Sequence, residues 1–564
     1  MSVSDPVTGI QTPDSGTEPR ADIRAAADDL VGGLLARPWG QVSPSVYETA
    51  RLVALAPWLT GHETRVDHLL ATQRPDGGWG APGGYALVPT LSAVDALLST
   101  LPGLGGPSDT APAERDIPHK RARAAGDGLR MLLRELPSLK GDDIPDTPAS
   151  DLIAGSLVDS INSRLAALEQ PGTPPAALGP LPAGARLRLP EGMDASRLDL
   201  VRAALQGGVD LPEKVFHALE VAGPLARGAA GIRVESTGTV GASPAATAAW
   251  LDGPAAGPAH PARRFLETVV ADHDGLAPCG IPITAFERGW VLSGLLRAGI
   301  EPRLPDSLVK ELADAIGPTG APAAAGLPAD SDTTSVALYT LALLDVRHPP
   351  DVLWHFETDG RFASWPGEQG FSITVNAHVL DAFGRFLARF GNTVDDTTRA
   401  RYTATAERIV AVLCDHQRPE GDWPDRWHAS PYYATYAAAL ALDDFGGEHA
   451  AGAVARARRW LLDTQRPDGS WGLWGGTAEE TAYALQVLLL TRGNPEEVNA
   501  AVAAGHGFLL RARDEALTGR FADPALWPAL WHDKDLYFPA AIVRGTVLAA
   551  LHLAQERLGG TATG

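Results

Sequence analysis

The chain has 564 residues, of which 45% are hydrophobic, and this is enough for about two to four domains with buried cores. Its formal net charge is −21 and it contains no basic run, which excludes nucleic acid as an expected partner. The two cysteines, Cys279 and Cys414, exclude a disulfide framework and a four-thiolate metal site, and their scarcity suits the reducing cytoplasm, where we expect the protein.

Residues 1–20 are polar and rich in Ser, Thr, Pro and Asp. They lack the basic end and the apolar core of a signal peptide, so we expect a disordered tail there. No run of about eighteen apolar residues free of charge follows, so we expect no membrane-spanning helix.

From residue 21 onward, alanine-rich amphipathic segments follow one another. Apolar residues recur in them every three or four positions, while Gly and Pro stand in the segments between them. This periodicity predicts helices at residues 21–35, 45–59, 90–101, 124–136, 152–168, 198–205, 261–270, 287–299, 335–344, 374–390, 398–417, 436–442, 454–465, 479–490 and 542–558. Residues 103–115 and 172–186 are expected to be loops. The sequence therefore predicts a nearly all-α protein.

A Gln-x-x-x-Gly-x-Trp sequence occurs at residues 73–79, 417–423 and 465–471, each time after a predicted amphipathic helix. The Gln side chain can bond free backbone groups, and the Pro-Asp-Gly or Pro-Glu-Gly within the repeat makes a tight turn. We therefore expect each repeat to join one helix to the start of the next. Helix pairs joined in this way predict α/α barrels, and two separated groups of repeats predict two of them.

Asp330-Ser-Asp332-Thr-Thr precedes the predicted helix at residues 335–344. Two carboxyl groups one residue apart can form a proton donor for catalysis, because one can hydrogen-bond or electrostatically burden the other, and burial disfavours ionisation, so that one proton is retained for transfer. Such a proton can be transferred to a weak base such as an alkene. The alternative interpretation is helix capping, since Asp, Ser and Thr are the preferred N-cap residues. The three Gln-Trp turns in the same chain favour the acid.

The chain resembles the class II terpene cyclases. The resemblance rests on the acid motif, the Gln-Trp turns and five local strings: Trp39-Gly-x-x-Ser-Pro-Ser-x-Tyr-x-Thr-Ala, Pro212-x-Lys214-x-x-His-x-Leu-Glu220, Ser243-Pro-x-Ala-Thr247-Ala, Phe286-Glu-Arg-x-Trp290 and Asp533-Lys-Asp-Leu-Tyr537. It covers nearly everything after residue 21. It implies two α-barrel domains, with the first part of a β domain at residues 21–45, an inserted γ domain at 46–290 and the rest of the β domain at 291–564.

The resemblance implies protonation of the terminal alkene of a linear isoprenoid diphosphate, followed by ring closure with the diphosphate retained. It makes Asp332 the general acid and Asp330 the residue that holds or polarises it. Many relatives carry a further Asp at the position of Thr333. The replacement of this Asp by Thr occurs in a subset of bacterial diterpene cyclases. The acid also needs a partner for its other oxygen, and His378 is the first candidate, with Asn376 as the alternative. These two are two residues apart on one predicted helix, so they cannot face the same direction.

A diphosphate bound with Mg2+ needs oxygen ligands and basic side chains. The acidic residues Asp142, Asp143 and Asp146 stand where relatives carry a Mg2+-binding cluster, although a solvated loop is an equal interpretation. Lys214 and Lys534 lie in matching strings and are the candidates for contact with the phosphates. Aromatic faces stabilise carbocations, and the candidates for this role are Trp290, Phe362, Trp365, Tyr433 and Trp531.

The expected substrate is geranylgeranyl diphosphate, and the expected product is a bicyclic diphosphate of labdane, halimane or clerodane type. Farnesyl diphosphate, giving a drimane-type product, is the alternative substrate. Cys279 occupies the position of an Asn that holds water in ent-copalyl enzymes, so an ent-copalyl product is not expected. A non-catalytic binding protein on the same scaffold is the alternative of another class. A class I terpene synthase that uses the product is a possible partner in the pathway.

Overall fold

The computed structural model describes residues 18–104, 116–170, 177–368 and 370–560. Helices dominate this part of the chain, as expected, and its strands form two short antiparallel hairpins. None of the helices described is both long and apolar enough to cross a bilayer. Residues 1–17 of the expected tail lie outside these ranges, whereas residues 18–20 begin the first helix.

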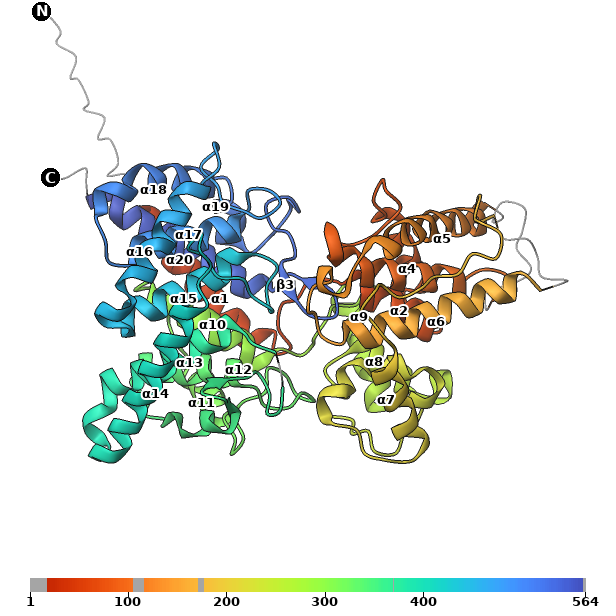
Figure 1. The fold of residues 1–564 in the computed structure, drawn as a ribbon, viewed down its shortest axis with the longest axis horizontal. Coiled ribbons are helices and arrows are strands. Elements are labelled where there is room, and N and C mark those ends of the chain that lie inside the picture. The colour runs from red at the N-terminus through yellow and green to blue at the C-terminus, as the bar shows by residue number, and fades with distance from the viewer. Residues whose placement is uncertain (1–17, 105–115, 171–176, 369, 561–564) are drawn as a thin grey trace, which may run out of the picture.

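Two units lie beside each other (Figure 1). We call residues 46–281 the N-terminal unit, and residues 18–45 with 282–560 the C-terminal unit. The helices of the N-terminal unit are α2 (Val46–Leu55), α3 (His62–Ala71), η1 (Gly83–Ala86), α4 (Leu87–Ser99), α5 (Asp116–Glu135), η3 (Leu136–Ser138), η4 (Gly141–Asp143), α6 (Ser150–Leu168), α7 (Ser196–Gln206), η5 (Glu213–Ala226), α8 (Pro244–Trp250), η6 (Gly253–Ala255) and α9 (Pro261–Asp272), where η denotes a 3-10 helix.

The C-terminal unit is larger and contains both hairpins. Its elements are α1 (Glu18–Ala36), α10 (Thr284–Arg297), α11 (Asp306–Asp314), α12 (Ser331–Leu343), η7 (Pro350–Phe356), β1 (Glu357–Thr358), β2 (Arg361–Phe362), α13 (Ile373–Phe390), η8 (Gly391–Thr393), α14 (Asp396–Asp415), α15 (Pro431–Phe445), α16 (Gly447–Thr464), α17 (Ala478–Leu490), α18 (Pro495–Leu509), α19 (Arg513–Thr518), β3 (Trp531–His532), β4 (Leu536–Tyr537) and α20 (Ala540–Gly560).

The buried apolar side chains form separate clusters that largely follow the two units. One large cluster joins residues 23–42 with 279–554, whereas three smaller clusters lie within residues 47–281. Helix α1 packs against α10, α19 and α20, so the N-terminal unit is an insertion between α1 and α10. Trp290 belongs to the large cluster, because α10 packs on α12 and α20. The exact domain limits, expected at residues 45 and 290, stay a prediction.

The three Gln-Trp repeats have the same geometry. In the first, Gln73 donates to the carbonyls of Gly77 and Ala124, at 2.8 and 2.9 Å. The indole of Trp79 donates to Leu69 of the preceding helix, and its backbone N–H donates to Thr90 of the following helix. Each repeat thus bonds three helices through one buried turn. The equivalent bonds of the other two repeats start at Gln417, Trp423, Gln465 and Trp471.

Candidate active site

A cavity of about 1300 Å³ lies between the two units. The N-terminal unit lines it with residues 144–152 and with parts of the segments 192–201 and 214–218. The C-terminal unit lines it with the acid motif, residues 364–368 and 426–433 in part, and the β3–β4 hairpin. Small-molecule sites usually measure about 300–1,000 Å³, so this cavity is large enough for a long, folded ligand.

Asp330 and Asp332 have different environments at the start of α12. Asp330 is the N-cap: its Oδ1 accepts from the backbone N–H of Thr333 at 2.6 Å, and its Oδ2 accepts from that of Ala323 at 3.2 Å. Asp332 lies in the first turn and lines the cavity. The capping interpretation is therefore right for Asp330, whereas Asp332 does not cap the helix and lies at the cavity wall. Thr333 also lines the cavity, where its N–H holds Asp330 in place.

His378, on α13, contacts the expected acid directly. Its Nδ1 lies 2.6 Å from Oδ1 of Asp332, and no bond joins Oδ2 of Asp332 to another described residue. Burial alone lowers the pKa of His378, but the charge and the hydrogen bond of Asp332 outweigh it, so that the pKa lies above its ordinary value. A protonated imidazole at this place stabilises the carboxylate that remains after proton transfer.

Asn376 does not contact the acid. Its side chain accepts from the N–H of Phe362 and donates to the carbonyls of Phe362 and Ser372. It therefore fixes β2 to α13, and of the two alternatives only His378 touches Asp332.

Two further carboxyl groups share the buried region of the acid. Burial, together with the charge of Asp332, raises the pKa of Asp330 to about 7 and that of Asp425 to about 6. Asp425 accepts hydrogen bonds from Thr374 and from the N–H of Trp427. Asp425 was missed in the sequence, where its only distinction is that it closely follows the second Gln-Trp repeat.

The expected aromatic residues are only partly at the cavity wall. Trp365, Tyr433 and Trp531 line it, with ring centroids of Tyr433 and Trp531 4.7 Å apart. Trp290 lies behind this wall and donates to the hydroxyl of Tyr433 at 2.7 Å. Phe362 is not among the residues that line the cavity, because its ring is fully buried against Phe383. Three lining aromatics were not expected: Phe286, Trp427 and Tyr537.

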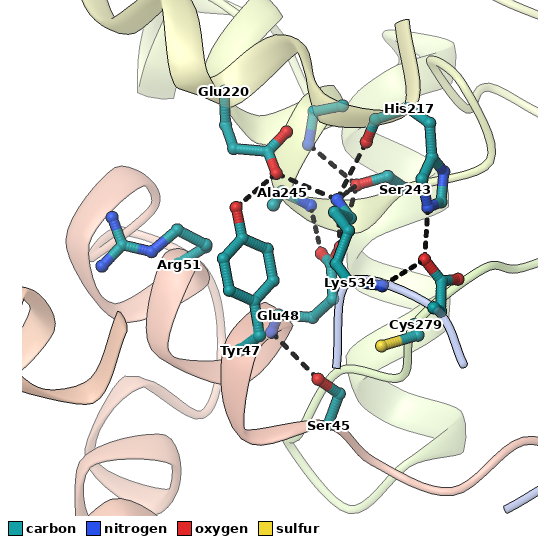
Figure 2. Close-up of polar contacts among 12 residues, drawn as sticks. Ser45, Tyr47, Glu48, Arg51, His217, Glu220, Ser243, Ala245, Cys279 and Lys534 are labelled. Carbon is teal, nitrogen blue, oxygen red and sulfur yellow. Dashed lines mark hydrogen bonds and ion pairs between the residues drawn. The ribbon is translucent and has the colours of Figure 1, made fainter. Parts of the chain in front are cut away.

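The structure also differs from the expectation that Lys534 contacts the phosphates. Lys534 lies in the β3–β4 turn of the C-terminal unit but is fully buried in the N-terminal unit (Figure 2). Its ammonium contacts Glu48 at 2.5 Å, Glu220 at 2.9 Å and Ser243 at 2.7 Å. Burial alone lowers the pKa of Lys534, but the two glutamates outweigh it and raise the pKa. Since all these contacts are internal, Lys534 cannot hold a phosphate.

The neighbour of Lys534 strengthens the same contact between the units. Asp533 accepts from His217 at 2.6 Å and from the N–H of Gly280 at 2.9 Å. Burial raises the pKa of Asp533, but His217 outweighs it and lowers the pKa to about 2. His217 also bonds the carbonyl of Gly241 through its other ring nitrogen, so this dyad is ionic and fixed. The cavity wall formed by the hairpin is thereby attached to the opposite unit.

The other charged candidates lie at the cavity margin. Lys214 lines the cavity, as do Asp151 and Arg197, which pair at 3.3 Å. Asp146 lines it and pairs with Arg426 at 2.9 Å. Asp143 is exposed and accepts from the N–H of Lys140.

The side chain of Asp142 lies outside the part that the structure describes. Among the side chains that it does describe, no three His, Cys, Asp or Glu form a metal cluster.

A small second cavity of about 40 Å³ lies on the other side of His378. It is lined by polar groups that include Arg297, Tyr339 and Asp381. Since one water needs roughly 10–15 Å³ of such space, water can reach the imidazole from this side.

Comparisons with known proteins agree with this geometry. Residues 371–505 match the family model of the squalene-hopene cyclase C-terminal domain. The chain is 40% identical over 538 residues to an ent-copalyl diphosphate synthase of Streptomyces sp. (strain KO-3988), covering 95% of this chain and 97% of the relative. It is 38% identical over 546 residues to a labda-7,13-dienyl diphosphate synthase of Streptomyces clavuligerus, covering 96% and 94%.

Among solved structures, the ent-copalyl diphosphate synthase from Streptomyces platensis has a TM-score of 0.84 and 42% identity. The similarity covers 95% of this chain and 99% of that one.

Proposed function

The chain belongs to the class II terpene cyclases, and from this we propose that it converts geranylgeranyl diphosphate into a bicyclic diterpenyl diphosphate. The observation that carries the proposal is the pair of Asp332 and His378 at the wall of the large cavity. The relatives named above are synthases of copalyl and labdadienyl diphosphates, which supports a C20 substrate. Their similarity over almost the whole chain also argues against a non-catalytic binding protein.

Proton transfer starts the reaction. The carboxyl group of Asp332 gives its proton to the terminal alkene, a new C–H bond forms, and the electron pair of the O–H bond stays on the carboxylate. His378 holds the other oxygen, orients the acid and stabilises the carboxylate. His378 also separates Asp332 from the small cavity, through which water can return the proton.

Ring closure needs a wall without nucleophiles. Trp365, Tyr433 and Trp531 present aromatic faces there, and such faces stabilise a cation without trapping it. The cation is made by protonation of the alkene and not by loss of the diphosphate, so the diphosphate stays in the product, and the last cation is quenched either by transfer of a proton to a base or by capture of water. We further propose that a class I terpene synthase consumes this product, and that the enzyme works in the cytoplasm, whose reducing conditions suit its free cysteines.

We also propose that Mg2+ binds at the cavity margin. Asp146 and Asp151 supply carboxylate oxygens there, and Mg2+ is usually held by one or two carboxylates together with substrate phosphates. We propose that these residues hold it, with Lys214 and Arg197 near the phosphates. Bound Mg2+ would neutralise the diphosphate and fix its position.

The test is incubation of the purified protein with Mg2+ and either geranylgeranyl or farnesyl diphosphate, followed by phosphatase treatment and mass spectrometry. A bicyclic C20 alcohol from geranylgeranyl diphosphate alone is the expected result. A cyclic C15 alcohol alone would replace the proposal with the drimane alternative, and no cyclic product from either substrate would reject both. Chiral analysis of the alcohol tests the prediction, based on Cys279, that the product is not ent-copalyl.

A further inference from the structure

Arg426 crosses the margin of the cavity from one unit to the other. It lies in the C-terminal unit, just after Asp425. Its Nη2 pairs with Asp146 of the N-terminal unit at 2.9 Å, and its Nη1 pairs with Glu368 of its own unit at 2.7 Å. All three charged side chains line the cavity. One guanidinium is therefore shared between two carboxylates at the place where the units meet.

The two ion pairs of Arg426 differ in exposure. The side chains of Arg426 and Glu368 are 15% and 13% exposed, whereas that of Asp146 is 68% exposed. The guanidinium also lies tightly against Gly370, where a Cβ atom would be only 1.8 Å from Nη1. The carbonyl of Arg426 accepts from His532. Arg426 is thus held firmly by its own unit, and Asp146 is the partner that can leave.

Asp146 has a second use in the proposed function, because its carboxylate is one of the expected Mg2+ ligands. Mg2+ and Arg426 therefore compete for the same oxygens. A Mg2+ diphosphate offers a new partner to each side chain of this ion pair. The metal can pair with Asp146 in place of Arg426, and the phosphate oxygens can pair with the planar guanidinium of Arg426 in place of Asp146. The Nε of Arg426, buried and without a partner among the described residues, offers a further donor. The exchange leaves no charge unpaired.

We propose that the Asp146–Arg426 ion pair is a latch that the Mg2+ diphosphate group of the substrate opens, after which Arg426 binds the diphosphate. The proposal rests on the proposed function, since it assumes a diphosphate substrate. In the resting protein the latch joins the two units. In the bound protein the same arginine holds the substrate, so that substrate binding and the contact between the units are coupled.

The test measures binding by isothermal titration calorimetry on the full chain, with magnesium chloride and with inorganic pyrophosphate as probes. In Arg426→Gln, Asp146 is free, and because ion pairs with an exposed partner contribute about 0.2–1 kcal/mol, Mg2+ should bind roughly 1.4- to 5-fold more tightly. Pyrophosphate in the presence of Mg2+ should bind roughly ten-fold more weakly or worse, because a charge-assisted hydrogen bond is lost. Arg408→Gln is the matched control, since Arg408 pairs with Glu357 away from the cavity, and it should change neither affinity.

Asp146→Asn provides an independent arm if Arg426→Gln does not fold. This variant frees Arg426, so metal-free pyrophosphate should bind more tightly, while Mg2+ should bind more weakly. A fall of both affinities in Arg426→Gln, or unchanged pyrophosphate binding in both variants, would overturn the latch. Such a result would leave the proposed function intact as long as the cyclic C20 alcohol is formed, because these measurements need no turnover.

Discussion

Removal of the Lys534 ammonium should destabilise the protein strongly. In Lys534→Met, Glu48 and Glu220 lose the cation that both contact, and both stay buried beside each other. Breaking a buried ion pair by removal of one partner costs about 3–5 kcal/mol. For domains of this size, this corresponds to a fall of roughly 6–20 °C in the melting temperature.

The assay is thermal and urea unfolding followed by circular dichroism. Lys310→Met is the control, because Lys310 forms an exposed pair with Asp314 on one helix, and its loss should cost less than about 0.5 kcal/mol. If Lys534→Met is no less stable than this control, the cluster in Figure 2 does not hold the units together and our reasoning is refuted.

The effect should also depend on pH. Burial already raises the pKa of Glu48 against the opposing charge of Lys534, and loss of that charge raises it further above the unfolded value of about 4.3. The native Glu48 carboxyl group then keeps a proton at pH values where the unfolded chain has lost it, so stability falls as the pH rises through this range. The destabilisation of Lys534→Met should therefore be smallest near pH 4 and larger at pH 7. The same loss at both pH values would contradict this explanation.

Three further predictions concern the acid and the repeats. Asp332→Asn should abolish cyclisation in the product assay while the melting temperature stays unchanged. Turnover at the wild-type rate in this variant would mean that another residue is the general acid. His378→Ala should lower kcat roughly 10²- to 10⁴-fold with a smaller change in KM, because the partner of the acid is lost; an unchanged kcat would remove His378 from the mechanism. Gly421→Ala should lower the melting temperature, since Gly421 has a φ of 106° and a Cβ would lie 2.5 Å from the carbonyl of Arg456; stability equal to the wild type would show that this turn can relax.

Much of the fold could be predicted from periodicity, since each amphipathic segment named in the sequence is helical. Two of the helices that were missed, α3 and α18, have weak patterns. In α3, the fully buried apolar residues are only Val66 and Leu69, and α18 contains Gly505 and Gly507, which lower helix propensity. Helix α12 begins at Ser331, four residues before the predicted start, because Asp330 caps it and the polar residues of the motif form its first turn.

The site could be predicted only where a motif fixed it. Asp332 and His378 lie 46 residues apart, yet the resemblance placed both, and the structure brings them to 2.6 Å. Lys534 could not be placed correctly, because its partners Glu48 and Glu220 come from distant segments, and a lone lysine in a sequence does not reveal that it is buried. Arg426 was missed for the same reason: its role depends on contact between two units.

The insertion between α1 and α10 has a consequence for how the chain folds. Residues 46–281 are contiguous and carry their own buried clusters, so they can fold as soon as they leave the ribosome. Helix α1 is made first, yet its partner α20 is made last, more than 500 residues later. Until α20 is made, α1 has only α10, and later α19, to pack against. The packing of α1 is therefore complete only after nearly all of the described chain has been made.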